Sequence, residues 1–593
     1  MTTYTAPVAD TMFVLRHVLR IHERKDLPGF DEDLLDVSAS ALAMVGEFCA
    51  DVLQPLNAVA DLDGCAQAAD GTVVTPPGFV DAYRRFAQGG WGGLAIPADQ
   101  GGGGMPLVLA QACHEYVWSA NPSFAMYASN LGHVRILMKH GTEEQQRAYI
   151  PQLASGEWTG AMGLTEPAAG SDLSLVRTVA TPREDGTYAV NGGKIFTSGG
   201  EHDLTDNIIH FVLARLPGAP EGTRGLSMFL VPKMLLDDQG RPAVRNGVAA
   251  SRVEHKMGLR GSATCQMNYD DATGFLVGEP HRGLAAMFVL MNELRITAST
   301  VGVGVAEVAY QNAAAYAKER HQGRSPIAGR NGDGAADPIL EQPDVRRLLL
   351  TVGSFAEAAR ALLLWTSLQS DIAARSDDPD ERHAAGRRLA LFTPVVKGTL
   401  PDFSFESAVY AQLIFGGHGY MTETGVDQFI RDVRMAAFGE GVTAIQADDL
   451  VRRKIGIDSG RVVEQALADI EDDVQAAEST GQVDSASLMA MRTGLGHLRE
   501  ATEWISAADP AAAAAGGVHY LYLFGRVALG WMWLREAAAA ARLRAAGEQS
   551  PALERKDALA RFYLSRLPIE TARHLDLMRA ESESVLSLPA AAF

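Results

Sequence analysis

One glutamate between two glycines is the residue in this chain best suited to acid–base chemistry. Glu440 lies in the stretch FGEGVTAIQ, just before a helix predicted to run through Ile445 to Ile455. Glycine on both sides lets the backbone bend sharply and approach a ligand closely. Thr443, or the polar turn before it, is expected to cap the helix. The pattern predicts a carboxylate that projects from a turn into a pocket, and the alternative is an ordinary exposed loop acid.

The first of the regions that must position this glutamate is helical. A chain of 593 residues is too long for a single core, so several domains are expected. Residues 1–158 are predicted to form an N-terminal helical domain, because apolar residues recur there at helical spacing. Its helices are expected at 31–59, with a break at Pro55, and at 77–88, 106–118, 131–140 and 143–154.

The pattern changes to strands in residues 159–284. Short β-rich runs separated by turn residues occupy 188–190, 208–214, 226–231 and 266–269. The dipeptide Asn191-Gly192 after the first run predicts a hairpin turn. This region is therefore predicted to be a middle β domain, either a sandwich or a barrel.

Helical periodicity returns after the β domain and continues to the end of the chain. Residues 285–456 are predicted to form a C-terminal four-helix bundle that carries Glu440, with helices at 284–316, 345–372, 384–398 and 403–415 and a mobile loop at 323–336. Residues 457–593 are predicted to be an additional helical domain, with helices at 462–478, 485–507, 511–546 and 555–580. The extra domain shows no catalytic constellation, so a role in packing or assembly is expected.

Composition and the distribution of cysteines argue against several kinds of binding partner and site. The net charge of −20 argues against nucleic acid or an anionic membrane as the main partner. No export signal precedes the first helix, so we expect a cytoplasmic location. The apolar run at 518–534 is shorter than the ~20 residues that span a bilayer. We therefore expect this run to be a buried helix and the protein to have no stable membrane insertion. No zinc or other metal site and no disulfide are expected, because no Cys pair or Cys/His cluster occurs among the four scattered cysteines Cys49, Cys65, Cys113 and Cys265.

Four further strings carry a family resemblance. They are MGLTEPAAGSD at Met162–Asp172, KIFTSGG at Lys194–Gly200, KMGLRGS at Lys256–Ser262, and FGGHGY at Phe415–Tyr420 followed by Arg431-Asp432. In order and spacing they resemble the acyl-CoA dehydrogenase family over about residues 30 to 455. The start at Tyr4–Val8, the helix at Ile445–Lys454 and the extra domain resemble the C-terminally extended subgroup, which includes enzymes acting on 3-(methylthio)propanoyl-CoA.

The resemblance implies an FAD-dependent oxidoreductase that acts on CH–CH groups. Such enzymes remove an α-proton from an acyl-CoA thioester and pass the β-hydrogen as hydride to the flavin, which yields the 2,3-enoyl-CoA. Glu440 is then the base, and burial beside the flavin is expected to disfavour its charged form. The resemblance gives the backbone N–H of Glu440 and a flavin ribityl hydroxyl as hydrogen-bond donors to the thioester oxygen.

The resemblance also assigns binding residues one by one. The residues matched to FAD are Met162, Leu164, Thr165, Gly170, Ser171, Phe196, Thr197, Ser198, Arg320, Gln322, Gly416, Gly417 and Val442, and those matched to the substrate are Ser171, Asn292, Arg295 and Gly441. Among these, Arg320 and Gln322 match a segment that reaches the cofactor pyrophosphate of a neighbouring subunit, which implies a homo-oligomer. We expect a dimer, because the extra domain would block the interface of shorter tetrameric relatives.

Three positions depart from the family pattern. Phe196 replaces a common tryptophan, which keeps ring stacking but loses an indole N–H, although a core aromatic is the alternative. Val442 replaces a threonine hydroxyl next to the flavin, and Leu413 occupies the place of a glutamine, with Gln412 displaced by one. These changes weaken the assignments of Val442 and Gln412 and leave the fold prediction intact.

A second base position exists in some family members. Matching the family arginine to Arg295 places Leu294 at that position, and Glu293 is one residue away. One residue turns a helix by about 100°, so Glu293 is expected to point elsewhere. Glu440 is therefore the preferred base.

Several functions remain open. The substrate is either 3-(methylthio)propanoyl-CoA or a straight-chain acyl-CoA of fatty-acid metabolism, short or medium to long. An electron-transfer flavoprotein is the expected acceptor, whereas an acyl-CoA oxidase would pass electrons to oxygen. A non-enzymatic relative that binds flavin or nucleic acid is a third reading, and both the retained Glu440 and the acidic charge argue against it.

Overall fold

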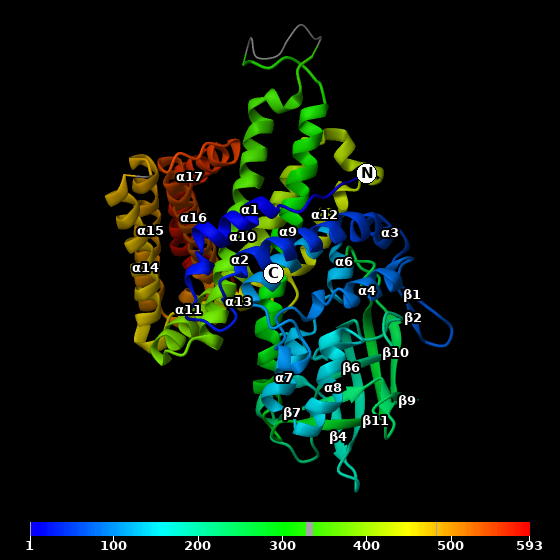
Figure 1. Ribbon diagram of the computed structural model, residues 1–593. Helices are drawn as coiled ribbons and strands as arrows, with labels where there is room; N and C mark the ends of the chain where they lie inside the picture. Colours follow the sequence, from blue (N-terminus) through cyan, green and yellow to red (C-terminus); the bar gives the residue numbers. More distant parts are fainter. Residues whose placement is uncertain (1, 328–335, 482, 593) are drawn as a thin grey trace. The chain divides into compact units, whose positions relative to one another are not determined.

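The computed structural model describes residues 2–327, 336–481 and 483–592 (Figure 1). The chain divides into two compact units. One unit comprises residues 1–46 and 295–593, and we call it the helical unit. The other comprises residues 47–294, and we call it the mixed unit. The predicted order of a helical region, a β region and two further helical regions is confirmed.

The mixed unit begins with helices. They are α3 (Pro55–Asp63), α4 (Phe79–Gln88), α5 (Leu107–Ala120), α6 (Pro122–Ala125), α7 (Leu131–His140) and α8 (Glu143–Ser155). Pro55 begins α3, where its missing N–H costs no hydrogen bond. This predicted helical region also contains one short strand pair that was not predicted, in which β1 (Ala66–Gln67) pairs with β2 (Val73–Val74). Asp70 forms the turn between the two strands by accepting hydrogen bonds from Thr72.

A seven-stranded sheet follows the helices. Its strands are β3 (Trp158–Gly163), β4 (Val179–Pro182), β5 (Tyr188–Ser198), β6 (Asn207–Arg215), β7 (Leu226–Pro232), β10 (Val248–Val253) and β11 (Thr264–Val277), while β8 (Met234–Leu236) and β9 (Pro242–Arg245) form a separate pair. The order is β10-β11-β5-β4-β6-β3, and β7 pairs with both β6 and β11. The pairings β11–β5–β4–β6–β7–β11 close a ring, as in a barrel. Leu137, Phe211 and Leu290 belong to the core that joins this sheet to α7 and the start of α9.

The hairpin predicted at Asn191-Gly192 does not form. β5 continues through both residues and pairs with β11 on both sides of them. Asn191 instead accepts a hydrogen bond from the backbone N–H of Asp271, where β11 bulges. A Cβ on Gly192 would lie 2.6 Å from Oγ1 of Thr178, so the glycine permits the close approach of Thr178 rather than a turn.

The helical unit contains the long helices. They are α1 (Val8–Phe13), most of α2 (Leu34–Phe48), α9 (Gly283–Glu319) from Arg295 onward, α10 (Pro343–Arg375), α11 (Pro379–Ile414), α12 (Val426–Arg434), α13 (Thr443–Asp449), α14 (Arg461–Thr480), α15 (Ser485–Ala507), α16 (Pro510–Ala545) and α17 (Pro551–Ser587). Helices α14 to α17 lie side by side in Figure 1 and form the extra helical region. Part of the loop predicted at 323–336 lies outside the described residues.

Helix α11 is one helix where two were predicted. It passes through Pro394 and Pro401 without ending. Both prolines are buried, and Oγ of Ser404 donates a hydrogen bond to the Gly302 carbonyl of α9 at 2.6 Å. Dense packing on both sides of the helix therefore outweighs the cost of the two prolines.

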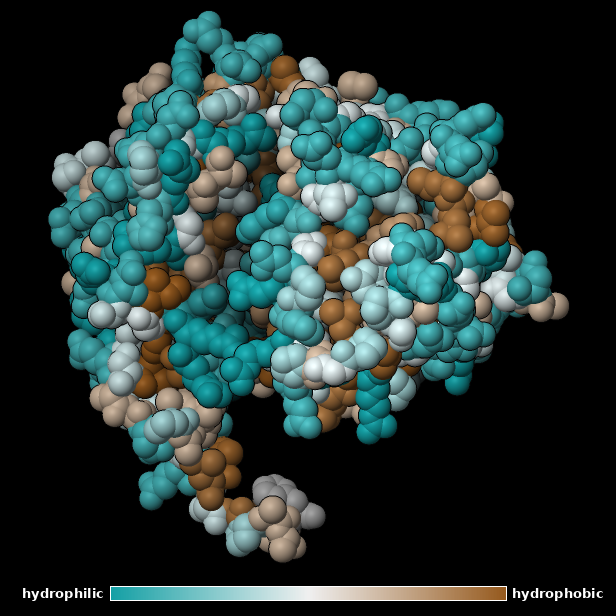
Figure 2. Space-filling view, turned by 90° about the horizontal axis from the view of Figure 1, so that it is seen from below, coloured by the Kyte–Doolittle hydropathy of each residue, from teal (hydrophilic) through white to brown (hydrophobic). Residues whose placement is uncertain are grey.

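Within the described residues, two helices, α9 and α10, are long and apolar enough to cross a membrane. In α10, 89% of the most apolar window is buried inside the protein, and a buried core helix meets the same length and composition test. The apolar run at 518–534 lies within α16 and is mostly buried. Figure 2 shows one face of the molecule, on which hydrophilic side chains predominate and hydrophobic ones form small groups. All four cysteines are free.

Candidate functional site

Glu440 lies in a tight turn between two helical segments of the helical unit. The turn follows the 3₁₀ segment Met435–Ala437 and precedes α13. Glu440 itself has a φ of 58°, and Gly441 has a φ of 94°. A left-handed conformation costs a residue other than glycine on the order of 1 kcal/mol, so the surrounding structure must hold Glu440 in place.

Two buried side chains hold this turn. Nζ of Lys397, on α11, donates to the carbonyl oxygen of Gly441 at 2.5 Å and to that of Ala437 at 3.5 Å. Nε2 of Gln446 donates to the carbonyls of Glu440 at 3.1 Å and Gly441 at 3.3 Å. Sequence reasoning missed both residues, although a lysine inside the apolar run of α11 was a possible signal.

The predicted capping of the following helix is wrong. Thr443 is the first residue of α13, and Val442 occupies the N-cap position, where it makes no side-chain hydrogen bond. Oγ1 of Thr443 donates instead to Asp402 on α11 at 2.7 Å. Asp402 also accepts a hydrogen bond from Tyr522 of α16 at 2.8 Å, so the same carboxylate ties the turn to the extra helical region.

Burial and two nearby positive charges together set the proton affinity of Glu440. Burial raises the pKa of Glu440 to about 7, although the nearby charges of Lys397 and Arg295 oppose this rise. Burial likewise lowers the pKa of Lys397 to about 8, against the charges of Glu440 and Asp402. A carboxylate with a pKa near 7 suits a general base that works at neutral pH.

The backbone at Glu440 offers a second chemical group. Among the described residues, the N–H of Glu440 donates to no acceptor in the protein. A free N–H beside a carboxylate can bind an oxygen that gains negative charge while the carboxylate removes a neighbouring proton. Arg295, predicted to contact substrate, is buried and lies 3.6 Å from Asp449, and its Nε has no partner within the described ranges.

The predicted flavin residues of the mixed unit lie on two adjoining segments. Met162 is on β3, Leu164 and Thr165 follow this strand, and the backbone N–H of Ile195 on β5 donates to the carbonyl of Thr165 at 2.8 Å. Phe196, Thr197 and Ser198 end β5, so the structure brings the two segments together. Gly170 and Ser171 are exposed in the turn beyond Thr165.

A buried ion pair that sequence reasoning missed fixes this arrangement. Nζ of Lys194 donates to Glu166 at 2.8 Å and to the carbonyl of Leu164 at 3.1 Å. Glu166 also accepts hydrogen bonds from the backbone N–H groups of Arg177 and Thr178. Because the carboxylate is fully hydrogen-bonded, its burial is compensated, and the loop after β3 is pinned to β5.

The exposed end of β5 fits an aromatic cofactor. Phe196 has a φ of 57° and is 62% exposed, so it is not a core aromatic. Oγ1 of Thr197 is buried and has no hydrogen-bond partner within the described part of the chain. An exposed ring beside an unused hydroxyl fits the stacking and hydrogen bonding that an isoalloxazine requires.

The remaining predicted cofactor residues lie at two helix ends of the helical unit. Arg320 and Gln322 follow α9, and both are exposed. Gly416 and Gly417 follow α11, and a Cβ on either would meet open space, so packing within the chain does not require glycine there. Tyr316 of α9 donates to or accepts from His418 at 2.7 Å, which places these two helix ends side by side.

The alternative base is engaged elsewhere. Glu293 forms an ion pair with Arg135 of α7 within the mixed unit. Its neighbour Asn292, predicted to contact substrate, is exposed on α9.

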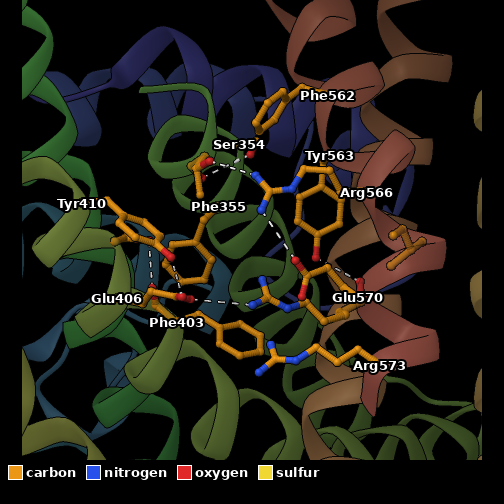
Figure 3. A pocket seen from close by; sticks show the side chains of 14 residues that line it. Ser354, Phe355, Phe403, Glu406, Tyr410, Phe562, Tyr563, Arg566, Glu570 and Arg573 are labelled. Atoms are coloured by element: carbon orange, nitrogen blue, oxygen red, sulfur yellow. Dashed lines mark hydrogen bonds and ion pairs between the residues drawn. The ribbon is translucent and has the colours of Figure 1, made fainter. Parts of the chain in front are cut away.

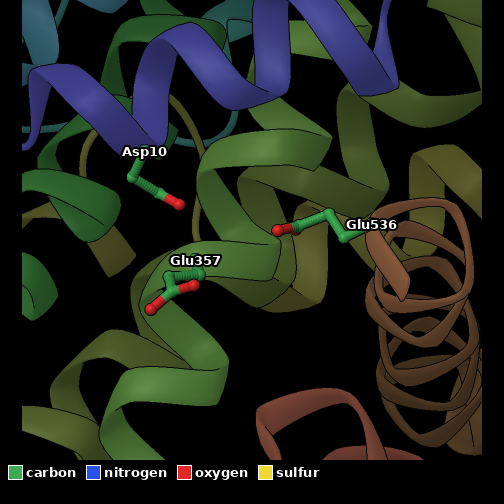
Figure 4. A group of neighbouring side chains, drawn as sticks. All are labelled: Asp10, Glu357 and Glu536. Carbon is green, nitrogen blue, oxygen red and sulfur yellow. The ribbon is translucent and has the colours of Figure 1, made fainter. Parts of the chain in front are cut away.

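Three neighbouring carboxylates in the helical unit, two of them buried, could be taken for a metal site. The carboxylates of Asp10, Glu357 and Glu536 lie within 4.8 Å of one another (Figure 4). However, Nζ of Lys556 donates to Glu357 at 2.8 Å, to Glu536 at 2.5 Å and to Asp10. An ammonium already occupies the position a cation would take, so the cluster is a buried ion network.

Comparison with family models covers nearly the whole chain. Residues 39–157 match the acyl-CoA dehydrogenase N-terminal domain, 161–272 the middle domain, and 281–455 the C-terminal domain of the same family. Residues 466–589 match the domain described as acetyl-CoA dehydrogenase C-terminal like.

Individual proteins align over their full length. The chain is 40% identical to 3-methylmercaptopropionyl-CoA dehydrogenase of Ruegeria pomeroyi, over 99% of each sequence. It is 33% identical to the broad-specificity linear acyl-CoA dehydrogenase FadE5 of Mycobacterium tuberculosis, over 100% of each.

Solved structures share the fold. Caenorhabditis elegans ACDH-11 in complex with C11-CoA superposes with a TM-score of 0.77 at 19% identity, covering 96% of this chain and 92% of that one. An acyl-CoA dehydrogenase complexed with FAD from Bacillus anthracis gives a TM-score of 0.71 at 18% identity, covering 93% and 92%.

Proposed function

Because the chain belongs to the acyl-CoA dehydrogenase family, we propose that it oxidises the C2–C3 bond of 3-(methylthio)propanoyl-CoA with Glu440 as the base. The assignment of Glu440 as the base rests on its backbone conformation and on the pKa of its carboxyl group. It is held at a φ of 58° before Gly441, and its pKa is raised to about 7. A carboxylate so placed accepts a proton at neutral pH and is not an ordinary loop acid.

The chain's own groups then divide the reaction between them. Glu440 removes the proton from C2 of the thioester, and its backbone N–H donates to the thioester oxygen as negative charge develops there. FAD, the cofactor of this family, would when bound supply the acceptor for the hydride from C3, so that the double bond of the 2,3-enoyl-CoA can form. Phe196 and Thr197 are proposed to contact the isoalloxazine ring, and Arg320 and Gln322 the pyrophosphate of a neighbouring subunit.

The proposed substrate follows from similarity. The Ruegeria pomeroyi relative, named for 3-methylmercaptopropionyl-CoA, aligns along the entire chain. A second candidate is a straight-chain acyl-CoA, because the Mycobacterium tuberculosis relative, which also aligns along the entire chain, is named for linear acyl-CoA substrates. The two candidates differ in whether a sulfur or a methylene stands at position 4 of the acyl chain.

Anaerobic titration of the yellow, FAD-loaded protein tests both steps of the proposal. We expect 3-(methylthio)propanoyl-CoA to bleach the flavin faster than pentanoyl-CoA, its carbon isostere, and than octanoyl- or palmitoyl-CoA. Faster bleaching by a straight-chain thioester would transfer the assignment to the second candidate. Glu440→Gln should retain the flavin but abolish its bleaching, and full bleaching by this variant would remove Glu440 from the base role.

We further propose an electron-transfer flavoprotein as the acceptor, a homodimer as the assembly and the cytoplasm as the location. Peroxide formation without an added carrier would identify an acyl-CoA oxidase instead. Sedimentation of the FAD-loaded protein distinguishes a dimer from a tetramer.

A further inference from the structure

A cavity of about 190 Å³ lies in the helical unit between α10 and α11 on one side and α16 and α17 on the other (Figure 3). None of the residues assigned to the flavin, the substrate or the base lines it. Phe355, Phe403 and Phe562 form its apolar wall. The remaining lining is rich in charge, with three arginines and two glutamates.

Arg526, which lines this cavity, has one hydrogen-bond donor that is not used within the described part of the protein. The Cζ atom of its guanidinium group lies over the ring of Phe403, 3.9 Å from the centroid. Its Nε is buried and has no partner among the residues that the structure describes. The nearest carboxylate oxygen, on Glu406, is 3.8 Å away, beyond hydrogen-bonding distance, and Tyr410 donates to the other oxygen of Glu406 at 2.7 Å.

Two arginines of α17 add to this positive charge. Arg566 donates to Oγ1 of Thr351 at 3.0 Å and lies 3.6 Å from Glu570. Arg573 takes part in none of the ion pairs found within the described ranges, and in Figure 3 its side chain points from α17 toward Phe403. Among the described residues that line the cavity, three arginines are matched by two glutamates, so the lining carries one positive charge in excess.

From this arrangement we infer that the cavity binds a small molecule in which a phosphate or carboxylate group is attached to an apolar or aromatic portion. Guanidinium groups pair bidentately with such oxyanions, and Arg526 and Arg573 have donors free to do so. The phenylalanine wall offers a surface for the apolar portion. The cavity is smaller than the roughly 300–1,000 Å³ typical of pockets for drug-sized ligands, so a compact ligand fits and a CoA thioester does not.

Calorimetric titration of the full FAD-loaded chain tests the inference with three probes, namely phenyl phosphate, benzoate and inorganic phosphate. We expect at least one of the two aromatic anions to bind more tightly than inorganic phosphate, and the tighter of the two identifies the preferred anionic group. If neither aromatic anion binds, or if inorganic phosphate binds as tightly as both, the inference is overturned.

Three variants distinguish binding of the anion in this cavity from binding elsewhere on the protein. Arg573→Gln should weaken binding of the aromatic anion about tenfold, which corresponds to ~1.4 kcal/mol. Glu406→Gln should strengthen it severalfold, because a competing carboxylate is removed. Arg499→Gln, on an exposed residue of α15 outside the cavity, should leave the affinity unchanged. Equal affinity in the native chain and in folded Arg573→Gln would place the anion elsewhere and refute the assignment.

Discussion

The ammonium of Lys397 donates a hydrogen bond to the main-chain oxygen of Gly441, the residue that follows Glu440. The same ammonium reaches the carbonyl of Ala437, so one buried charge joins the two sides of the turn that presents the base. Lys397 is also the first charged group that opposes the rise of the pKa of Glu440. It therefore both positions the carboxylate and tunes its proton affinity.

Replacing Lys397 with Met should slow flavin bleaching by acyl-CoA at least tenfold at neutral pH. Loss of the two hydrogen bonds loosens the turn, and loss of the positive charge raises the pKa of Glu440 further above 7. The rate should recover as the pH rises, with its midpoint about one unit above that of the native chain. Anaerobic stopped-flow measurements of bleaching across a pH series provide this profile.

The matched control is Lys139→Met, on an exposed lysine at the end of α7. It should change neither the rate nor the midpoint. A lower rate for Lys397→Met with an unmoved midpoint would show that Lys397 acts on the shape of the turn alone and not on the charge of Glu440.

The ionisation of Glu440 should also make the free energy of unfolding depend on pH. The pKa of Glu440 in the folded chain, about 7, lies above its ordinary value of 4.5, so between these values the folded state binds more protons than the unfolded state. The native chain therefore loses stability as the pH rises through this window, by on the order of 1 to 3 kcal/mol, whereas Glu440→Gln has no such loss. Thermal unfolding of both proteins below and above the window measures the effect. A difference in unfolding temperature that is the same at both pH values would contradict the raised pKa.

A threonine at position 442 should stabilise the start of α13. Val442 occupies the N-cap with extended ψ and offers no side-chain acceptor to the first turn. In Val442→Thr the hydroxyl can accept from a backbone N–H of that turn, which stabilises helix ends by about 0.5–2 kcal/mol. Hydrogen exchange of the amides at 443–449 should slow accordingly. Val442→Ala, which supplies no acceptor, is the control and should show no slowing.

Much of the fold and part of the site could be predicted from local patterns. The helix predicted at 131–140 is α7 with the same bounds, because an apolar stripe and a following glycine mark such a helix directly. The string Gly-Glu-Gly likewise predicted the turn at Glu440, because left-handed backbone conformations favour glycine.

Contacts between distant residues could not be predicted in this way. Lys397 is 44 residues before its partner Gly441, and no local pattern records that the two meet. Gly192 suggested a turn, but the actual cause is the close approach of Thr178, the residue just before β4. The sequence pattern predicted a helix end at residue 398 and a new helix at 403, yet α11 continues through this interval and through Pro401, which is buried by tertiary packing.

Lys556→Met should destabilise the helical unit by about 3–5 kcal/mol, because it removes the counter-ion shared by the buried Glu357 and Glu536 and the partly buried Asp10. Burial alone would raise the pKa of Asp10, but the charges of Lys556 and Arg360 lower it to about 2. For Glu536 burial prevails over the charge of Lys556 and raises the pKa to about 7. The loss should be greatest above pH 7, where all three carboxylates would be ionised, and smaller near pH 5, where Glu536 is protonated. Thermal unfolding at the two pH values measures this loss of stability. The control is Lys25→Met, at an exposed lysine paired with Glu32, and it should change stability by less than about 1 kcal/mol. Unfolding of Lys556→Met at the native temperature at both pH values would show that the network contributes no net stability.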